Sequence, residues 1–242
     1  MKVETADRLV ELNHQFYQTF GADFSATRAR LQPGVRRVLA DWEGQEGILD
    51  LGCGNGNLAR ELAIRGHRGP YLGLDFSLVL LGAAGPVPEG FSAQFRQRDI
   101  TSPDWDADLP VSSFDIICAF AVLHHIPGEA MRLRLLEKAR RLLRPEGKII
   151  LSSWQFMSSE KFRARLQGWD KAGLSPREVD PDDYLLDWRG GGSGLRYVHH
   201  FSEAALGALA ERANFRVAGS FYSDGQNRRL GLYQTWERGF LS

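Results

Sequence analysis

The sequence predicts an α/β fold in which a mostly parallel sheet is covered by helices on both faces. Short apolar runs follow one another along the chain, and the first, 48–51, leads into a triple-glycine turn and a helix start. Two later runs lead to an acidic residue, at Asp75 and at Asp99. Strands that alternate with helices in this order are typical of doubly wound parallel sheets.

The glycine turn that follows the first strand predicts a pocket for a nucleotide-type cofactor. Its glycines allow positive φ and close approach of the backbone to a ligand, and the helix from Leu58 onward presents free N–H groups at its start. The glycines stand at 52, 54 and 56, whereas the dinucleotide fingerprint requires G-x-G-x-x-G, so a pyrophosphate ligand is disfavoured. A tight strand-to-helix turn without a ligand is the alternative for the turn taken alone.

Four further runs predict the remaining strands of the core. The run 71–75 ends at Asp75, where doubly wound sheets present a carboxylate to ribose hydroxyls. The run 93–100 places Asp99 to accept from an adenine amino group, with Ile100 packed on the ring. The apolar run 113–120 reads as a strand buried on both faces. The last run, 147–152, follows a helix stop with turn chemistry at 143–147.

From Val35 to Trp154 the chain resembles the class I S-adenosylmethionine (SAM) methyltransferases. The Asp-x-Gly-x-Gly-x-Gly pattern that begins at Asp50 resembles their first motif, and the stretch from Phe114 to Pro127 resembles their fourth. The resemblance implies a Rossmann-like fold, with a seven-stranded, mostly parallel sheet, an antiparallel C-terminal strand and helices on both faces. It also implies SAM as cofactor, with S-adenosylhomocysteine (SAH) as product. The residues expected at the cofactor are Tyr17, Arg28, Asp50, Gly52, Gly54, Asn55, Asp75, Phe76, Ser77, Asp99, Ile100, Phe120, Ala121 and His124.

Aromatic residues near the N-terminus predict a lid over this cofactor. The segments 16–17 and 24–28 interrupt an otherwise helical pattern before a helix expected at 33–42. Tyr17, Phe24 and Arg28 are then placed to close the pocket, and Ser25 is placed to cap a short turn. Aromatic packing at the edge of the domain, without a lid function, is the alternative.

The chain length of 242 residues predicts one methyltransferase domain, 1–242, with a single core. Its expected parts are an N-terminal lid (1–34), a SAM-binding core (35–154), a substrate-side insertion (155–202) and a C-terminal helix with strands (203–242). The insertion contains a glycine-rich run at 190–194. Such a run predicts a flexible loop that orders over a substrate, with a plain surface linker as the alternative.

Composition narrows the class of protein. The net charge is zero, which removes the simple argument for a polyanionic partner, although 25 of the 30 basic residues are arginine, the side chain that suits phosphate. For the arginine-rich helix expected at 130–143, a solvated basic face is the favoured interpretation. The two cysteines give no disulfide framework, and no His/Cys/Asp cluster has metal-ligand spacing, so no metal is expected. The chain shows no leader or long apolar span, so we expect a cytoplasmic protein without a membrane.

Three segments carry a narrower resemblance. The Phe-Ser-x-Thr-Arg stretch 24–28 resembles the entry motif of the tRNA wobble-uridine methyltransferases that esterify 5-carboxymethyluridine. Asp187-Trp188 with the stretch 196–201, and the stretch 225–236, resemble later parts of that family. The chain departs from the family pattern where no proline precedes Trp188, Val198 replaces a tyrosine and Arg228 replaces an aromatic residue. The resemblance implies tRNA as a partner and, as in eukaryotic members, a small activating protein partner.

The chemistry of the acceptor decides which residues are needed. A carboxylate is ionised at neutral pH and needs only a cation to orient it, for which Arg28 and Arg196 are candidates. A phenol or alcohol would need a base such as His124, His125 or His199. The candidate catalytic residues are Arg28, Arg196 and His199, and the candidate substrate-binding residues are Trp188, Arg196, Tyr197 and His199.

Other methyl acceptors are disfavoured. Methylation of an exocyclic amine of DNA or RNA usually needs an Asn/Asp-Pro-Pro-aromatic turn, which the stretch 120–123 lacks, so a DNA partner is not expected. Methylation of pyrimidine C5 needs a nucleophilic cysteine, and neither Cys53 nor Cys118 is placed for it. The alternatives to a tRNA carboxylate methyltransferase are a small-molecule O- or carboxyl methyltransferase and a SAM-binding subunit without catalysis. The alternative without catalysis is disfavoured because the cofactor motif is intact at Asp50, Gly52, Gly54, Asp75 and Asp99.

Overall fold

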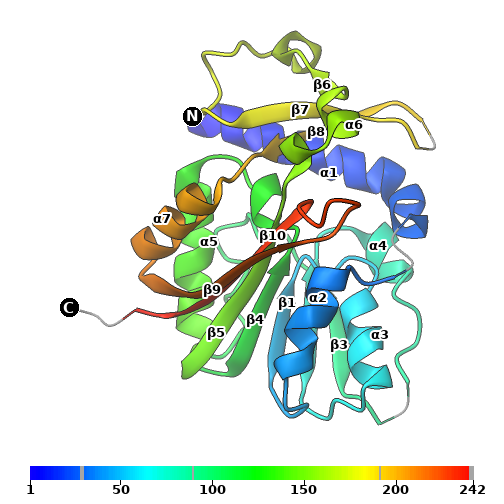
Figure 1. Cartoon of the computed structure of the whole chain (residues 1–242), viewed down its shortest axis with the longest axis vertical. Coiled ribbons are helices and arrows are strands. Elements are labelled where there is room, and N and C mark those ends of the chain that lie inside the picture. Colours follow the sequence, from blue (N-terminus) through cyan, green and yellow to red (C-terminus); the bar gives the residue numbers. More distant parts are fainter. Residues whose placement is uncertain (28–29, 89, 191, 240–242) are drawn as a thin grey trace.

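The computed structural model describes residues 1–27, 30–88, 90–190 and 192–239. A seven-stranded sheet forms its centre, in the strand order β3-β2-β1-β4-β5-β10-β9 (Figure 1). The strands are β1 (Ile48–Leu51), β2 (Tyr71–Asp75), β3 (Ala93–Gln97), β4 (Phe114–Phe120), β5 (Leu143–Trp154), β9 (Phe215–Ser223) and β10 (Gly231–Arg238). All pairs from β3 to β5 are parallel, and β10 runs antiparallel to both of its neighbours. The predicted sheet is thereby confirmed.

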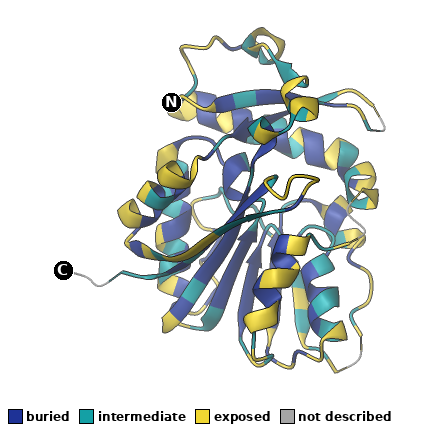
Figure 2. Cartoon of the chain, viewed as in Figure 1, coloured by how far each residue is buried: buried dark blue, intermediate teal, exposed yellow. Residues whose placement is uncertain are grey.

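Helices cover both faces of this sheet because the central strands are apolar on both sides. On one face, α5 (Glu129–Leu142) and α7 (Glu203–Arg212) pack on alternate strand residues such as Leu49 and Ile117. On the other face, α2 (Pro33–Val38), the 3-10 turn η1 (Leu39–Asp41) and α3 (Asn57–Ile64) pack on Ile48 and Ile116. Figure 2 shows the strands buried between helices whose outer faces are exposed. Since successive strand side chains point to opposite faces, this alternation fixes the register of the sheet.

A second layer lies across the carboxyl ends of the central strands. It consists of the long helix α1 (Val3–Ala26) and a three-stranded sheet of β6 (Leu166–Gln167), β7 (Asp183–Trp188) and β8 (Gly194–His199) (Figure 1). The connections carry α4 (Leu78–Gly82), α6 (Glu160–Arg163) and three 3-10 turns, η2 (Leu123–His125), η3 (Phe156–Ser158) and η4 (Trp169–Ala172). This layer makes the carboxyl edge of the sheet the floor of a covered cavity.

The N-terminal segment differs from the prediction. α1 is one continuous helix of 24 residues, so the pair 16–17 does not interrupt it, and Ser25 lies within its last turn instead of capping a short turn. Phe16 and Tyr17 are both buried and pack with Trp188 and Leu80 in one cluster. Tertiary packing of these rings keeps the helix intact, where the sequence pattern alone suggests a break.

Two other segments also differ from expectation. β5 begins at Leu143, because Leu143 pairs with Phe114 and the residues up to 147 form a bulge before Lys148 pairs with Ile116. Within the glycine-rich run, Gly190 and Gly192 lie between β7 and β8, and Gly194 is the first residue of β8. Gly191 lies outside the described residues, so the flexibility predicted for the whole run is not established. A Cβ atom on Gly194 would lie 2.4 Å from the Phe20 ring, so a glycine here lets the hairpin pack closely on α1.

No helix in the described ranges combines the length and the apolar character needed to cross a bilayer.

Gly34→Ala should destabilise the fold. The added Cβ would lie 2.2 Å from the ring of Tyr233, which is 2% exposed and stacked on Phe221, so the ring has no room to move. Overpacking of this kind costs about 1–3 kcal/mol, to be measured by denaturant unfolding. Gly82→Ala is the matched control, because no atom lies within 4 Å of its added Cβ and it should leave stability unchanged or raise it. Equal stability of the two variants would contradict the packing described for α2.

Candidate active site

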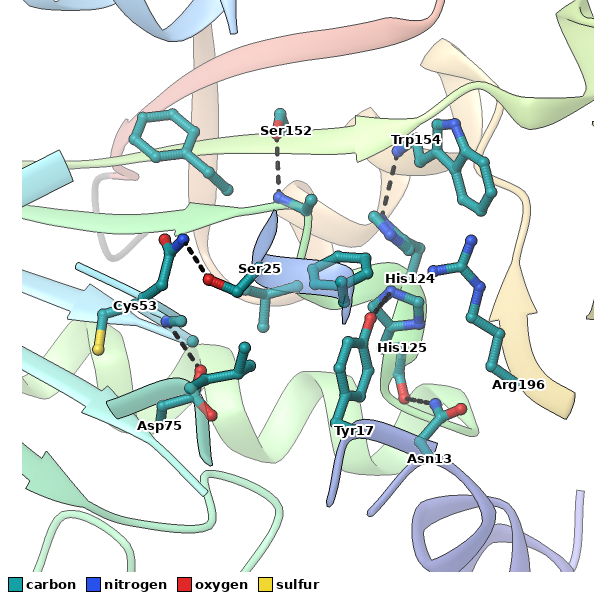
Figure 3. Close-up of a pocket in the computed structure, with 18 of the residues that line it drawn as sticks. Asn13, Tyr17, Ser25, Cys53, Asp75, His124, His125, Ser152, Trp154 and Arg196 are labelled. Atoms are coloured by element: carbon teal, nitrogen blue, oxygen red, sulfur yellow. Dashed lines mark hydrogen bonds between the residues drawn. The ribbon is translucent and has the colours of Figure 1, made fainter. Parts of the chain in front are cut away.

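A cavity of about 640 Å³ lies between the carboxyl edge of the large sheet and the layer formed by α1 and β8. Its volume is within the range of about 300–1,000 Å³ that is usual for ligand sites. The floor comes from the ends of β1, β2 and β4, and the roof comes from α1 and the β7–β8 hairpin. Figure 3 shows side chains from these separate elements converging on one space.

The glycine turn and Asp75 form one end of the cavity. The amide N–H groups of Gly52 and Cys53 both donate to the carbonyl of Leu74, which fastens the turn to β2. Gly54 has φ +55°, and a Cβ atom there would meet nothing within 4 Å, so its backbone is open to a ligand. A side chain at this position would project into that open space, which explains why the turn has glycine.

Asp75 is placed to hold a pair of hydroxyl groups. It is 6% exposed; its Oδ2 accepts from Gly54 N at 2.9 Å, and its Oδ1 accepts from Ser77 N at 2.9 Å. Each carboxylate oxygen accepts about two hydrogen bonds, so one position on each remains for a ligand. Burial raises the pKa of Asp75, and these backbone hydrogen bonds oppose the rise. A vicinal diol such as that of a ribose fits this arrangement.

A histidine from the lid covers the neighbouring part of the cavity. The ring of His14 stacks on Phe76, with centroids 4.2 Å apart, and its Nε2 lies 3.6 Å from Asp99 Oδ2. Burial acts to raise the pKa of Asp99, but hydrogen bonds from His14 and Thr101 outweigh it, and the pKa is lowered. Asp99 is therefore an ionised acceptor beside an aromatic surface, as recognition of an adenine amino group requires.

Asp50 lies beneath the glycine turn. It is 4% exposed, and it accepts a 2.6 Å hydrogen bond from the hydroxyl of Tyr71. Burial raises the pKa of Asp50 to about 7; the Tyr71 hydrogen bond opposes this rise, and the charge of Asp75 adds to it. Without a ligand, the floor of the cavity therefore holds a carboxyl group that ionises near neutral pH.

The opposite end of the cavity is aromatic and basic. The guanidinium carbon of Arg196 lies 4.7 Å from the Trp154 ring centroid, 5.4 Å from Phe16 and 5.9 Å from Trp188, and the residue is 5% exposed. Lys161, Arg165 and Arg189 also line the cavity, from the α6 region and the β7–β8 turn, and Arg30 lines it from the segment between α1 and α2. The lining carboxylates are Asp50, Asp75 and Asp99 at the sheet edge and Asp224 in the β9–β10 turn, and Arg98 also lines the cavity beside Asp99. Arg196 lies across the cavity from Asp75 (Figure 3).

The two histidines after β4 make hydrogen bonds through their ring nitrogens, His124 through Nδ1 and His125 through both. His124 Nδ1 accepts from the Trp154 amide at 3.3 Å, so its neutral form carries the proton on Nε2. His125 Nδ1 donates to the Tyr197 carbonyl at 3.1 Å, and its Nε2 accepts from the Tyr17 hydroxyl at 2.9 Å. Neither ring can take a proton from an acceptor without giving up one of these bonds. This arrangement disfavours general-base chemistry and suits an acceptor that is already ionised.

The structure places most of the expected residues along the cavity. The lining includes Tyr17, Asp50, Gly52, Gly54, Asn55, Asp75, Phe76, Asp99, Ile100, Phe120, Ala121, His124, Trp188 and Arg196. Ser77 is fully buried, caps α4 and holds Asp75 from below, so it supports the site without lining it. Arg28 lies outside the described residues.

Tyr197 and His199 do not lie where the prediction put them. Both make 2.7 Å hydrogen bonds to Oδ1 of the buried Asp183, on the other side of β8 from the cavity. Arg132 donates to the Tyr197 hydroxyl at 2.9 Å and completes this cluster. Successive side chains of a strand point to opposite faces. Because Arg196 points to the cavity, Tyr197 and His199 point to the other face of β8. The predicted contact of both residues with substrate is therefore corrected to a role in holding β8.

Sequence reasoning missed three contributions to the site. His14 shares a helix face with Tyr17, and that i, i+3 spacing was the available signal. Asp224 accepts from the amide of Gly34 and from the Tyr233 hydroxyl, and the Asp-Gly turn that it opens was visible in the sequence. The cations of α6 and of the β7–β8 turn had no local signal, because only the tertiary fold brings them to the cavity.

Asp50→Asn should change how stability depends on pH. The folded pKa of about 7 lies above the ordinary value of 3.8, so as pH rises the unfolded chain releases this proton first. The stability present below pH ~4 is therefore lost progressively up to pH ~7, and asparagine removes that loss. Denaturant unfolding across this range should show a smaller decline for the variant than for the wild type.

Asp41→Asn is the matched control for this measurement, because Asp41 is exposed. Its unfolding free energy should follow the wild-type pH dependence. If the unfolding free energy of Asp50→Asn also followed the wild-type pH dependence, the pKa of the Asp50 carboxyl would not be raised in the folded protein.

Comparison with known proteins identifies the family. A model of the methyltransferase domain matches residues 19–219. A protein of Encephalitozoon cuniculi (strain GB-M1) with a provisional methyltransferase name is 32% identical over 206 residues, which cover 84% of this chain and 87% of that protein. The tRNA (carboxymethyluridine(34)-5-O)-methyltransferase of Arabidopsis thaliana is 27% identical over 184 residues, 75% of this chain, but only 40% of its own length is covered.

A solved structure supports the fold independently. The DhpI-SAM-HEP complex superposes with a TM-score of 0.67 at 20% identity, covering 95% of this chain and 97% of DhpI. At this identity the likeness shows the fold alone, and it agrees with the strand order of the large sheet. The chain belongs to the methyltransferase domain family and has the class I SAM-dependent methyltransferase fold.

Proposed function

We propose that this enzyme transfers a methyl group from SAM to the carboxylate of a modified wobble uridine in tRNA. The observation that carries the proposal is the buried guanidinium of Arg196, held among three aromatic rings on the opposite side of the cavity from Asp75 (Figure 3). An anionic acceptor is attracted to this guanidinium. The Arabidopsis relative, named for a carboxymethyluridine methyltransferase activity, supports an acceptor of this kind.

The acidic end fits SAM. Asp75 presents one position on each carboxylate oxygen to a ribose diol, and Asp99 lies beside Phe76 where an adenine can be recognised. Gly54, at positive φ and with nothing within 4 Å of an added Cβ, leaves the backbone open toward the amino-acid part of the molecule. Bound SAM supplies an electrophilic methyl group on a sulfonium centre. The protein then has to position the acceptor and to stabilise the charges of an in-line displacement.

The basic end fits a carboxylate. Arg196 is held among three aromatic rings, which fix the direction of its guanidinium and exclude water from its faces. A guanidinium in this position can bind a carboxylate through two parallel hydrogen bonds. Since a carboxylate is ionised at neutral pH, the reaction needs no base, in agreement with the hydrogen bonds that His124 and His125 make through their ring nitrogens.

Transfer of label from radioactive SAM tests the proposal. The acceptors to compare are tRNA that carries the wobble carboxylate, a small-metabolite extract and unmodified tRNA. Label should enter the first, and mild alkali should release it, because a methyl ester hydrolyses where a methyl ether or methylamine does not. Alkali-stable label in tRNA would show a different acceptor group on the RNA, and label in the metabolites alone would identify a small-molecule methyltransferase. Either result would overturn the proposal.

Arg196→Met should impair transfer without loss of the cofactor site. Methionine keeps an apolar chain between the rings but removes a charged hydrogen-bond donor, whose loss costs about 1.5–3 kcal/mol. We therefore expect kcat/KM for the tRNA carboxylate to fall by about 10- to 100-fold. SAH affinity, measured by calorimetry, should stay at the wild-type value, whereas Asp75→Asn should weaken it. Wild-type transfer by Arg196→Met would rule out this arginine as the carboxylate ligand.

A further inference from the structure

We propose that four cations at the mouth of the cavity bind the phosphates that flank the target nucleotide, so that the enzyme reads the RNA backbone as well as the carboxylate. This inference rests on the proposed function and concerns the residues Arg30, Lys161, Arg165 and Arg189, which we call the cationic rim. They come from three separate segments: the end of the lid, the α6 region and the β7–β8 turn.

The rim is available to a ligand from outside. Arg30, Lys161 and Arg189 are exposed and Arg165 is half-buried, although all four line the cavity. Among the described residues, Asp187 is the carboxylate that pairs with a rim cation, at 2.8 Å from Arg189. The rim therefore keeps positive charge at the cavity mouth in a chain whose net charge is zero.

The carboxylates inside the cavity form no ion pair with the rim cations among the described residues, because hydrogen bonds hold each of them away from the mouth. Asp75 accepts from the glycine turn, Asp99 accepts from Thr101, and Asp224 accepts from Gly34 and Tyr233. Asp50 is bound by Tyr71 below the turn. An anion that approaches the mouth therefore meets the cations first.

Aromatic rings beside the rim indicate nucleic acid instead of another polyanion. The guanidinium of Arg165 lies 5.6 Å from the centroid of Phe162, and Phe162 makes an edge contact with Trp154 at 4.7 Å. Both rings line the cavity together with the rim cations. Cations that follow a backbone, interleaved with rings on which bases stack, are the usual combination in proteins that bind single-stranded RNA. An acidic peptide would use the charges but not the rings.

The rim and Arg196 then bind different parts of the RNA. The target nucleoside enters the cavity and presents its carboxylate to Arg196, while its neighbouring phosphates stay outside at the rim. The rim then contributes affinity for RNA and has no partner in a free nucleoside. Transfer to a nucleotide within RNA should therefore exceed transfer to the same nucleoside alone.

The test is a salt titration of binding to an anticodon stem-loop RNA that carries 5-carboxymethyluridine. For single strands, the slope of log affinity against log salt is about 0.7 per phosphate contact. Lys161→Gln combined with Arg165→Gln should therefore reduce the slope by about 1.4. The control is Arg68→Gln, which should leave the slope unchanged. Arg68 is exposed and lies between α3 and β2, at the amino edge of the sheet and away from the cavity.

Two comparisons separate failure of the rim from failure of the proposed function. If the wild type methylates neither the stem-loop nor free 5-carboxymethyluridine, the proposed function is wrong and the rim proposal falls with it. If it methylates the stem-loop while the double variant keeps the wild-type slope, the rim proposal alone is overturned. Equal weakening of binding to poly-glutamate and to RNA would show a general anion surface, which also contradicts it.

Discussion

Asn13 makes the set of hydrogen bonds on which the covered cavity depends. Its side chain accepts from the Tyr197 amide at 2.8 Å and donates to the carbonyls of Tyr197 and His125 at 3.2 and 3.0 Å. One buried amide thereby joins α1, β8 and the turn after β4, which together form the roof and one wall of the acceptor end. A side-chain amide both donates to and accepts from backbone groups. Asn13 therefore bonds to β8 as a neighbouring strand would, and this fixes α1 to β8.

The lid and the acceptor site are consequently one structure. Successive positions along α1 reach both ends of the cavity: His14 stacks on Phe76 beside Asp99, and Tyr17 donates to His125. Ser25 accepts from the Asn55 side chain at 2.8 Å, so the last turn of α1 is also tied to the glycine turn. The helix therefore orders the cofactor end and the acceptor end together, as pre-organised binding of two reactants requires.

The sequence was sufficient for the core of the fold and for much of the cofactor end. The glycine turn and Asp75 follow from local signals, because a strand that ends at a tight turn has few alternatives. The acceptor end depends on tertiary pairing, which no local signal contains. The sequence motif groups Tyr197 and His199 with Arg196, although strand alternation separates them once β8 pairs with β7. The expected break at Tyr17 is absent because its ring is buried against neighbours distant in sequence.

If the acceptor is a carboxylate in tRNA, the nucleosides of cells that lack this chain should differ from those of cells that have it. Total tRNA from cells with and without the chain would be digested and analysed by mass. Without the chain, we expect the methyl ester at the wobble uridine to disappear and its free carboxymethyl acid to accumulate. An unchanged ratio of ester to acid would contradict this expectation and would assign the arginine-lined end of the cavity to another acceptor.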